Sequence, residues 1–80
     1  MTKNELINKI KDGYDIMFDV RGKHYTILTW TSDGIAIGEQ YPNDNEIQYF
    51  DTAEELVSQF KFNDVPLAEL ASEIRITEYT

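Results

Sequence analysis

The chain has 80 residues, no cysteine and a formal net charge of −8 at pH 7. This length favours a single domain over residues 1–80, burying roughly 60% of the surface that the unfolded chain exposes. The lack of cysteine excludes disulfides, thiolate metal sites and a cysteine nucleophile, and suits the reducing cytoplasm, where we expect the protein. We expect no signal peptide and no membrane span, because no stretch approaches ~18 apolar residues.

The chain opens with a helix signal. Thr2 and Glu5 form a T-x-x-E capping box, in which each side chain bonds the backbone N–H of the other residue. The apolar residues that follow share one helical face, and Gly13 can close the helix because it tolerates the left-handed conformation. We expect this helix over residues 3–11.

Alternation of apolar and polar residues begins next, and it predicts strands with one buried face. Tight turns are expected at Arg21-Gly22 and at residues 31–34, and a polar loop at residues 41–46. Such short connections favour an antiparallel meander, since parallel strands need crossovers of about a dozen residues or more. We expect strands over residues 14–20, 23–30, 35–40 and 47–50.

The second of these strands leaves its outward face undetermined. The even-numbered residues from His24 to Trp30 and the odd-numbered residues from Tyr25 to Thr29 both include apolar side chains. We therefore expect an aromatic group on the outer face, either exposed or covered by the long loop.

The last part of the chain predicts two helices and a final strand. Thr52 and Glu55 form a second capping box, and Pro66 suits the first turn of another helix. The expected helices cover residues 53–60 and 66–73, and residues 74–79 alternate as a strand. The order α-β-β-β-β-α-α-β predicts an α+β fold, with three helices on one face of an antiparallel four-stranded meander that the C-terminal strand extends to five.

The negative charge is concentrated in the middle of the sequence. Residues 24–60 contain seven carboxylates and neither lysine nor arginine. Such a one-sided field repels nucleic acid and anionic membranes and attracts basic proteins. We therefore expect a basic protein partner, and no direct contact with nucleic acid or a membrane.

Helix capping accounts for some of these carboxylates, because acidic residues near a helix N-terminus are stabilised by the helix dipole. The others lie in or beside the turns of the meander, where aromatic residues also occur, as at interface hot spots. The alternative is that these charges only keep the chain soluble. The candidate partner-binding residues are Asp33, Glu39, Tyr41, Asp44, Glu46 and Asp51.

We expect no enzyme, no cofactor and no metal. His24 is the only histidine, so no catalytic triad can be argued, and no glycine-rich loop opens a helix to hold a phosphate. Residues 43–46 with Asp51 offer oxygen ligands for calcium, but they lack the EF-hand spacing and are better explained as a solvated loop.

The helix from Asn4 to Lys11, followed by the strand-like Tyr14-Asp15-Ile16, resembles the start of small acidic proteins of phages and mobile elements in Gram-positive bacteria. Some of these are anti-CRISPR inhibitors that occupy the DNA-binding cleft of an RNA-guided nuclease. The stretches 51–56 and 66–70 look like uncharacterised small proteins of the same bacteria.

That resemblance implies an acidic loop that occupies a basic cleft, with Asp44 and Glu46 as the nearest equivalents. Together with the charge distribution, it predicts a non-enzymatic interaction protein of inhibitor or phage accessory type. The alternative is a structural module that self-associates as a homodimer, through the exposed sheet face or the last strand.

Overall fold

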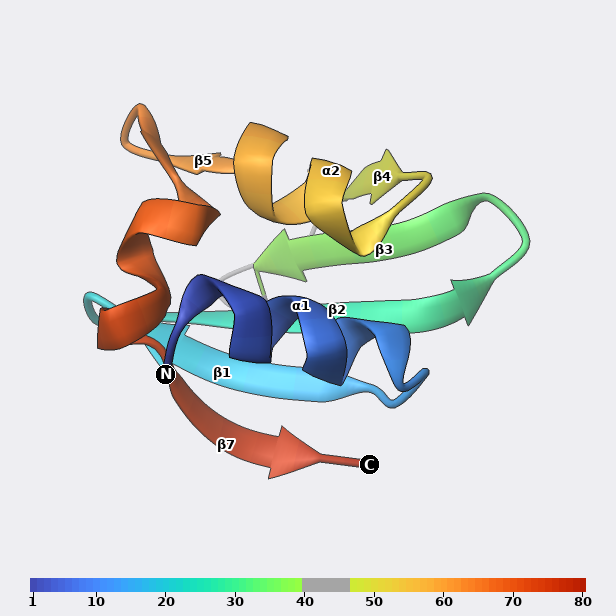
Figure 1. The fold of residues 1–80 in the computed structure, drawn as a ribbon, viewed down its shortest axis with the longest axis horizontal. Helices are drawn as coiled ribbons and strands as arrows, with labels where there is room; N and C mark the ends of the chain where they lie inside the picture. Colours follow the sequence, from blue (N-terminus) through green and yellow to red (C-terminus); the bar gives the residue numbers. More distant parts are fainter. Residues whose placement is uncertain (40–46) are drawn as a thin grey trace.

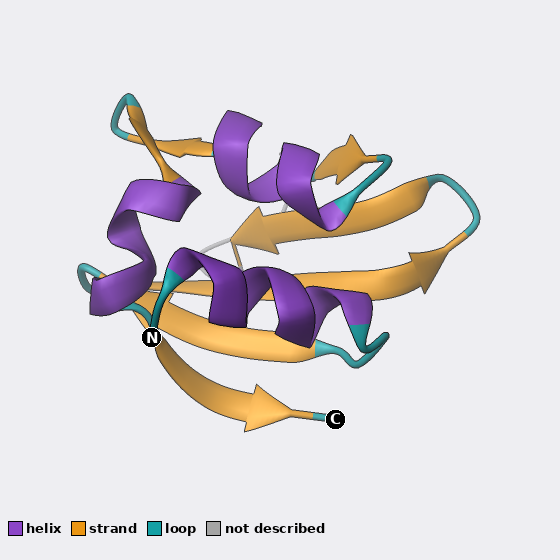
Figure 2. Cartoon of the chain, in the orientation of Figure 1, coloured by secondary structure: helices purple, strands orange, loops and turns teal. Residues whose placement is uncertain are grey.

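The computed structural model describes residues 1–39 and 47–80. Three helices lie over one face of a five-stranded antiparallel sheet, which confirms the expected α+β fold (Figures 1 and 2). The helices are α1 (Lys3–Lys11), α2 (Ala53–Gln59) and the 3₁₀ helix η1 (Leu67–Glu73). The sheet contains β1 (Ile16–Val20), β2 (Lys23–Thr31), β3 (Gly34–Glu39), β4 (Gln48–Phe50) and β7 (Arg75–Tyr79).

The sheet order is β4-β3-β2-β1-β7, so the first four strands form a meander and the last strand returns to pair with the first. Ile16 of β1 lies opposite Tyr79 of β7, and a register shift follows between Met17 and Phe18. The expected C-terminal strand is therefore confirmed, and it forms one edge of the sheet (Figure 1).

A small hairpin was not expected from the sequence. Strands β5 (Lys61–Phe62) and β6 (Val65–Pro66) pair across a turn in which Asn63 and Asp64 have φ values of 51° and 69°. Because Pro66 ends β6 in an extended conformation, the third helix begins one residue later than expected, at Leu67, and it is 3₁₀ rather than α.

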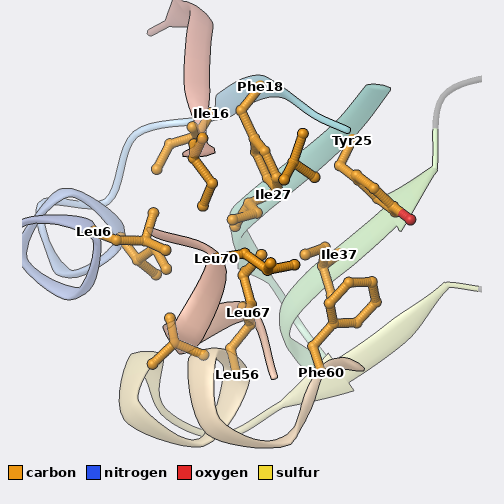
Figure 3. Close-up of a cluster of buried hydrophobic side chains, with 14 of the residues drawn as sticks. Leu6, Ile16, Phe18, Tyr25, Ile27, Ile37, Leu56, Phe60, Leu67 and Leu70 are labelled. Carbon is orange, nitrogen blue, oxygen red and sulfur yellow. The ribbon is translucent and has the colours of Figure 1, made fainter. Parts of the chain in front are cut away.

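The core lies between the sheet and the helices (Figure 3). Ile16, Phe18 and Ile27 point from the sheet toward the helices and are fully buried. Tyr25 contacts the rings of Phe18 and Phe60, at centroid distances of 5.6 Å in both cases. Burial, with a smaller contribution from a nearby carboxylate, raises the pKa of the Tyr25 hydroxyl above its ordinary value.

Two exposed contacts join distant parts of the chain. Arg21, in the β1–β2 turn, donates from Nε and Nη2 to the two carboxylate oxygens of Glu73 at 2.8 and 2.9 Å. The Tyr79 hydroxyl donates to Asp12 at 3.2 Å, and Lys9 Nζ lies 4.7 Å from the centre of the Tyr79 ring. These contacts tie η1 to a turn of the sheet and β7 to α1.

Candidate interaction surface

The helices cover only one face of the sheet, and we call the opposite face the open face. Side chains alternate along each strand, so the neighbours of the buried Ile16, Phe18 and Ile27 point to the open face. The even-numbered residues of β2 from His24 to Leu28 therefore face outward, which decides between the two sets that the sequence left open. The register shifts between Leu28 and Thr31, and the hydrogen bond from Trp30 to Asp15 places the indole on the same face. The open face carries Asp15, Met17, Asp19, His24, Thr26, Leu28, Trp30, Ala36, Gly38 and Tyr49.

Large apolar side chains are exposed on this face. Trp30 is 71% exposed, Tyr49 48% and Ile47 44%. A groove of about 270 Å³ runs over β2, β3 and β4, and its apolar lining includes Leu28 and Ala36. This volume lies below the range of about 300–1,000 Å³ that is usual for small-molecule sites, so the groove better suits a side chain of a partner protein.

Trp30 is held in place although it is exposed. Its Nε1–H donates to Asp15 Oδ1 at 2.7 Å. The contact follows from the register, because Ile16 pairs with Ile27 and Asp15 therefore lies beside the strand that carries Trp30. The other oxygen of Asp15, Oδ2, has no hydrogen-bond partner among the described residues.

Two of the predicted partner-binding residues come together at one end of the sheet. Asp33 lies in the β2–β3 turn, and Asp51 directly follows β4. Since Ile35 pairs with Phe50, both aspartates lie at the end of the sheet where β3 begins (Figure 1). β1 also begins at this end, so Asp15 joins them, and we call Asp15, Asp33 and Asp51 the acidic end. None of the three forms an ion pair with another described residue.

Glu39 does not join this group. It lies at the far end of β3, opposite Tyr25, which places its side chain on the helix-covered side of the sheet. There Lys23 Nζ approaches its carboxylate to 3.6 Å. The other predicted residues, Tyr41, Asp44 and Glu46, lie outside the described residues.

Two basic residues form ion pairs with carboxylates that do not belong to the acidic end. Arg21 is bound to Glu73 at the opposite end of the sheet, and Lys11 on α1 lies 2.5 Å from Glu54 on α2. Each carboxylate has its pKa lowered by hydrogen bonding to its cationic partner. None of the ion pairs among the described residues involves Asp15, Asp33 or Asp51.

Neither Asp15 nor Trp30 was among the residues predicted to bind a partner. The period-two pattern places both on one face, but only if the register of β1 and β2 is known. The Arg21-Gly22 turn carries that register, because a two-residue turn requires Val20 to pair with Lys23, as it does.

No group of three or more histidine, aspartate or glutamate side chains in ranges 1–39 and 47–80 could hold a metal ion. The calcium alternative involved residues 43–46, which lie outside these ranges. His24 Nδ1 contacts Asp19 Oδ1 on the open face, beside the β1–β2 turn.

Comparison with protein-family models, with curated proteins and with solved structures finds no match to this chain. The resemblance of the opening helix to small phage proteins therefore stays a prediction. Within the described residues, none of the helices has the length and apolar character that crossing a membrane requires.

Proposed function

We propose that this chain is a non-enzymatic interaction protein that docks on a basic protein, as an inhibitor or an accessory factor. The observation that carries this proposal is the acidic end, where Asp33 and Asp51 lie at the same end of the sheet and form no ion pair with another described residue. Exposed carboxylates of this kind attract a basic surface from a distance and set its orientation.

The overall charge supports the same class of partner. A net charge of −8 opposes binding to nucleic acid, whose phosphates are also negative. The partner can itself be a nucleic-acid-binding protein, since such proteins present basic surfaces. The absence of cysteine from the sequence supports a cytoplasmic location for this encounter.

The test compares two variants that each lose two negative charges. The first, Asp33→Asn with Asp51→Asn, neutralises the acidic end, and the control, Asp64→Asn with Glu69→Gln, removes two exposed carboxylates elsewhere. Each protein is used to capture partners from the native host, and the affinity of the captured protein is then measured by titration. We expect the first variant to bind roughly tenfold more weakly and the control to bind like the wild type.

Salt provides the second readout of the same experiment. Raising the ionic strength from about 0.01 to 0.15 M shortens the Debye length from roughly 30 to 8 Å, so wild-type binding should weaken. The acidic-end variant should show a smaller salt dependence than the control. Equal affinities of both variants for every captured partner would show that the acidic end is not the docking surface.

Self-association is a second candidate, because β7 is an edge strand of the sheet that the described residues form. Such an edge can pair with another copy of the same chain. This candidate is tested below by the oligomeric state.

A further inference from the structure

We infer that the open face binds an arginine of the basic partner, with its guanidinium over the Trp30 indole and hydrogen-bonded to Asp15. This inference rests on the proposed function and names the chemistry that the partner must present. It concerns the sheet face beside the acidic end, not the acidic end as a whole.

The Trp30 side chain is largely exposed to solvent. An indole that is 71% exposed leaves most of its surface in water, which is unfavourable unless another molecule covers it. The hydrogen bond from Nε1 to Asp15 restricts the orientation of the ring. A rigid, presented aromatic ring is typical of residues that contribute most to protein interfaces.

A carboxylate lies beside the ring. Asp15 Oδ1 accepts the hydrogen bond from the indole, and Oδ2 can accept a hydrogen bond from a donor of the partner. A cation over an indole is attracted by the π system, and it gains further from a carboxylate at the edge of the ring. Asp33 and Asp51 add to this field from the same end of the sheet.

The shape and hydration of the cation distinguish arginine from lysine at this site. A guanidinium is planar, so it can stack on the indole while its N–H groups, which lie in its own plane parallel to the ring, point toward Asp15. An ammonium group is compact and strongly hydrated, so it makes a poorer combination of ring contact and hydrogen bond to Asp15 than a guanidinium does. The geometry therefore favours arginine.

The groove supplies the second contact of the partner segment. Its lining includes Leu28, two residues before Trp30, and the register of β2 against β3 shifts between Leu28 and Thr31. Alternate side chains of an extended segment are about 6.6 Å apart, which lets a side chain two residues from the arginine reach the groove. An arginine over Trp30 therefore places an aliphatic side chain, two residues away in the partner, over the groove between Leu28 and Tyr49.

Charge also argues against a second copy of this chain on the open face. Two copies would bring together proteins that each carry −8. Arg75, which lies opposite Asp19 on β7, is at the other end of the sheet from Trp30. A basic partner removes this repulsion, and a second copy does not.

The experiment uses the full chain and a short extended peptide in which a single arginine is followed two residues later by valine, with neutral polar residues at the other positions. Two matched peptides replace arginine by lysine or by citrulline, its neutral analogue of the same shape. Trp30 is the only tryptophan, so its indole N–H gives a single NMR signal that reports on this site. We expect the arginine peptide to shift this signal, and the citrulline peptide to bind at least about fivefold more weakly, with lysine between them.

Variants of the protein complete the test. Asp15→Asn keeps an oxygen that can accept from Trp30 but removes the charge, and should weaken binding of the arginine peptide several-fold. Trp30→Ala and Trp30→Phe lack the indole N–H signal, so their binding is followed by calorimetric titration. Trp30→Ala should reduce the discrimination between arginine and citrulline, and Trp30→Phe should retain more of it. Glu69→Gln, the matched loss of one exposed carboxylate on η1, should leave binding unchanged.

Several outcomes would overturn the inference. Equal binding of the arginine and citrulline peptides, unchanged binding by Trp30→Ala, or a dimer that Trp30→Ala abolishes would each do so. A host partner that is lost with Asp33→Asn and Asp51→Asn but kept with Trp30→Ala would leave the proposed function standing and this inference wrong. A partner that needs neither set of residues would contradict both.

Discussion

Two turns of the sheet contain glycines whose backbone conformation a residue with a side chain rarely adopts. Gly22 has φ of 80° and no atom within 4 Å of where a Cβ would lie. Gly34 has φ of 118°, and a Cβ there would lie 2.7 Å from the carbonyl oxygen of Phe50. The first position therefore requires glycine for backbone conformation alone, and the second for conformation and space.

Alanine substitutions separate these two requirements. Gly22→Ala should lower the free energy of unfolding by about 1–2 kcal/mol, the cost of a left-handed conformation with a side chain. Gly34→Ala should cost about 3 kcal/mol, because the β3–β4 contact must also open. Urea denaturation of both variants measures the difference, and equal losses would contradict the close approach of Gly34 to Phe50.

The acidic and aromatic residues show where sequence reasoning reaches its limit at this scale. Asp33 and Asp51 could be identified as partner-binding candidates, since both flank turns and lack basic neighbours in sequence. The pairing of Glu39 with Lys23 could not, because it depends on the β2–β3 register. The Trp30–Asp15 contact joins residues 15 positions apart, and the period-two pattern indicates it only together with the register that the Arg21-Gly22 turn sets.

At the scale of elements, the contact between Arg21 and Glu73 fastens η1 to the β1–β2 turn. Hydrogen bonding to Arg21 lowers the pKa of the Glu73 carboxyl below its ordinary value of 4.5. The folded state therefore favours the ionised form of Glu73. This contribution to stability is fully present above pH 4.5 and is lost as the pH falls through the lower pKa of the folded state.

The prediction compares wild type with Glu73→Gln across pH. The variant should have a lower urea midpoint at pH 7, and the two midpoints should converge as the pH falls through the lowered pKa of the folded state. Arg21→Gln should show the same convergence, because it removes the other half of the contact. A constant difference from pH 7 to pH 2 would show that the loss comes from packing and not from the ionised pair.

The elements with strong local signals were predicted well. The first helix matches its expected range of residues 3–11, because its capping box and apolar face are independent of the rest of the fold. The short β5–β6 hairpin was missed, since two-residue strands carry no periodicity of their own. The 3₁₀ form of η1 was also missed, because Leu67, Leu70 and Ile74 fit an α-helical face as well.

At the scale of the whole molecule, the open question is whether two copies associate. The β7 edge exposes Arg75, Thr77 and Glu78, and charged residues at a sheet edge oppose pairing with another strand. The net charge of −8 adds repulsion between copies at low salt.

We therefore expect a monomer of 9.3 kDa in sedimentation velocity at protein concentrations up to about 0.1 mM. High salt screens the repulsion between net charges. If the β7 edge itself opposes strand pairing, the chain should therefore stay a monomer at high salt. A dimer that persists at all concentrations would favour the self-association alternative. Arg75→Ala with Glu78→Ala, which removes the edge charges, should then strengthen that dimer if it forms through β7.

The pairing of β7 with β1 has a consequence for synthesis of the protein on the ribosome. The N-terminal strand emerges early, but its neighbour on the sheet edge lies about 60 residues later in the chain, since Phe18 pairs with Ile76. Until residues 75–79 leave the exit tunnel, β1 has an uncovered edge and the hydrophobic layer stays incomplete. Nascent chains arrested before this point should be open to proteases and to chaperones, and should acquire resistance only when the last strand arrives.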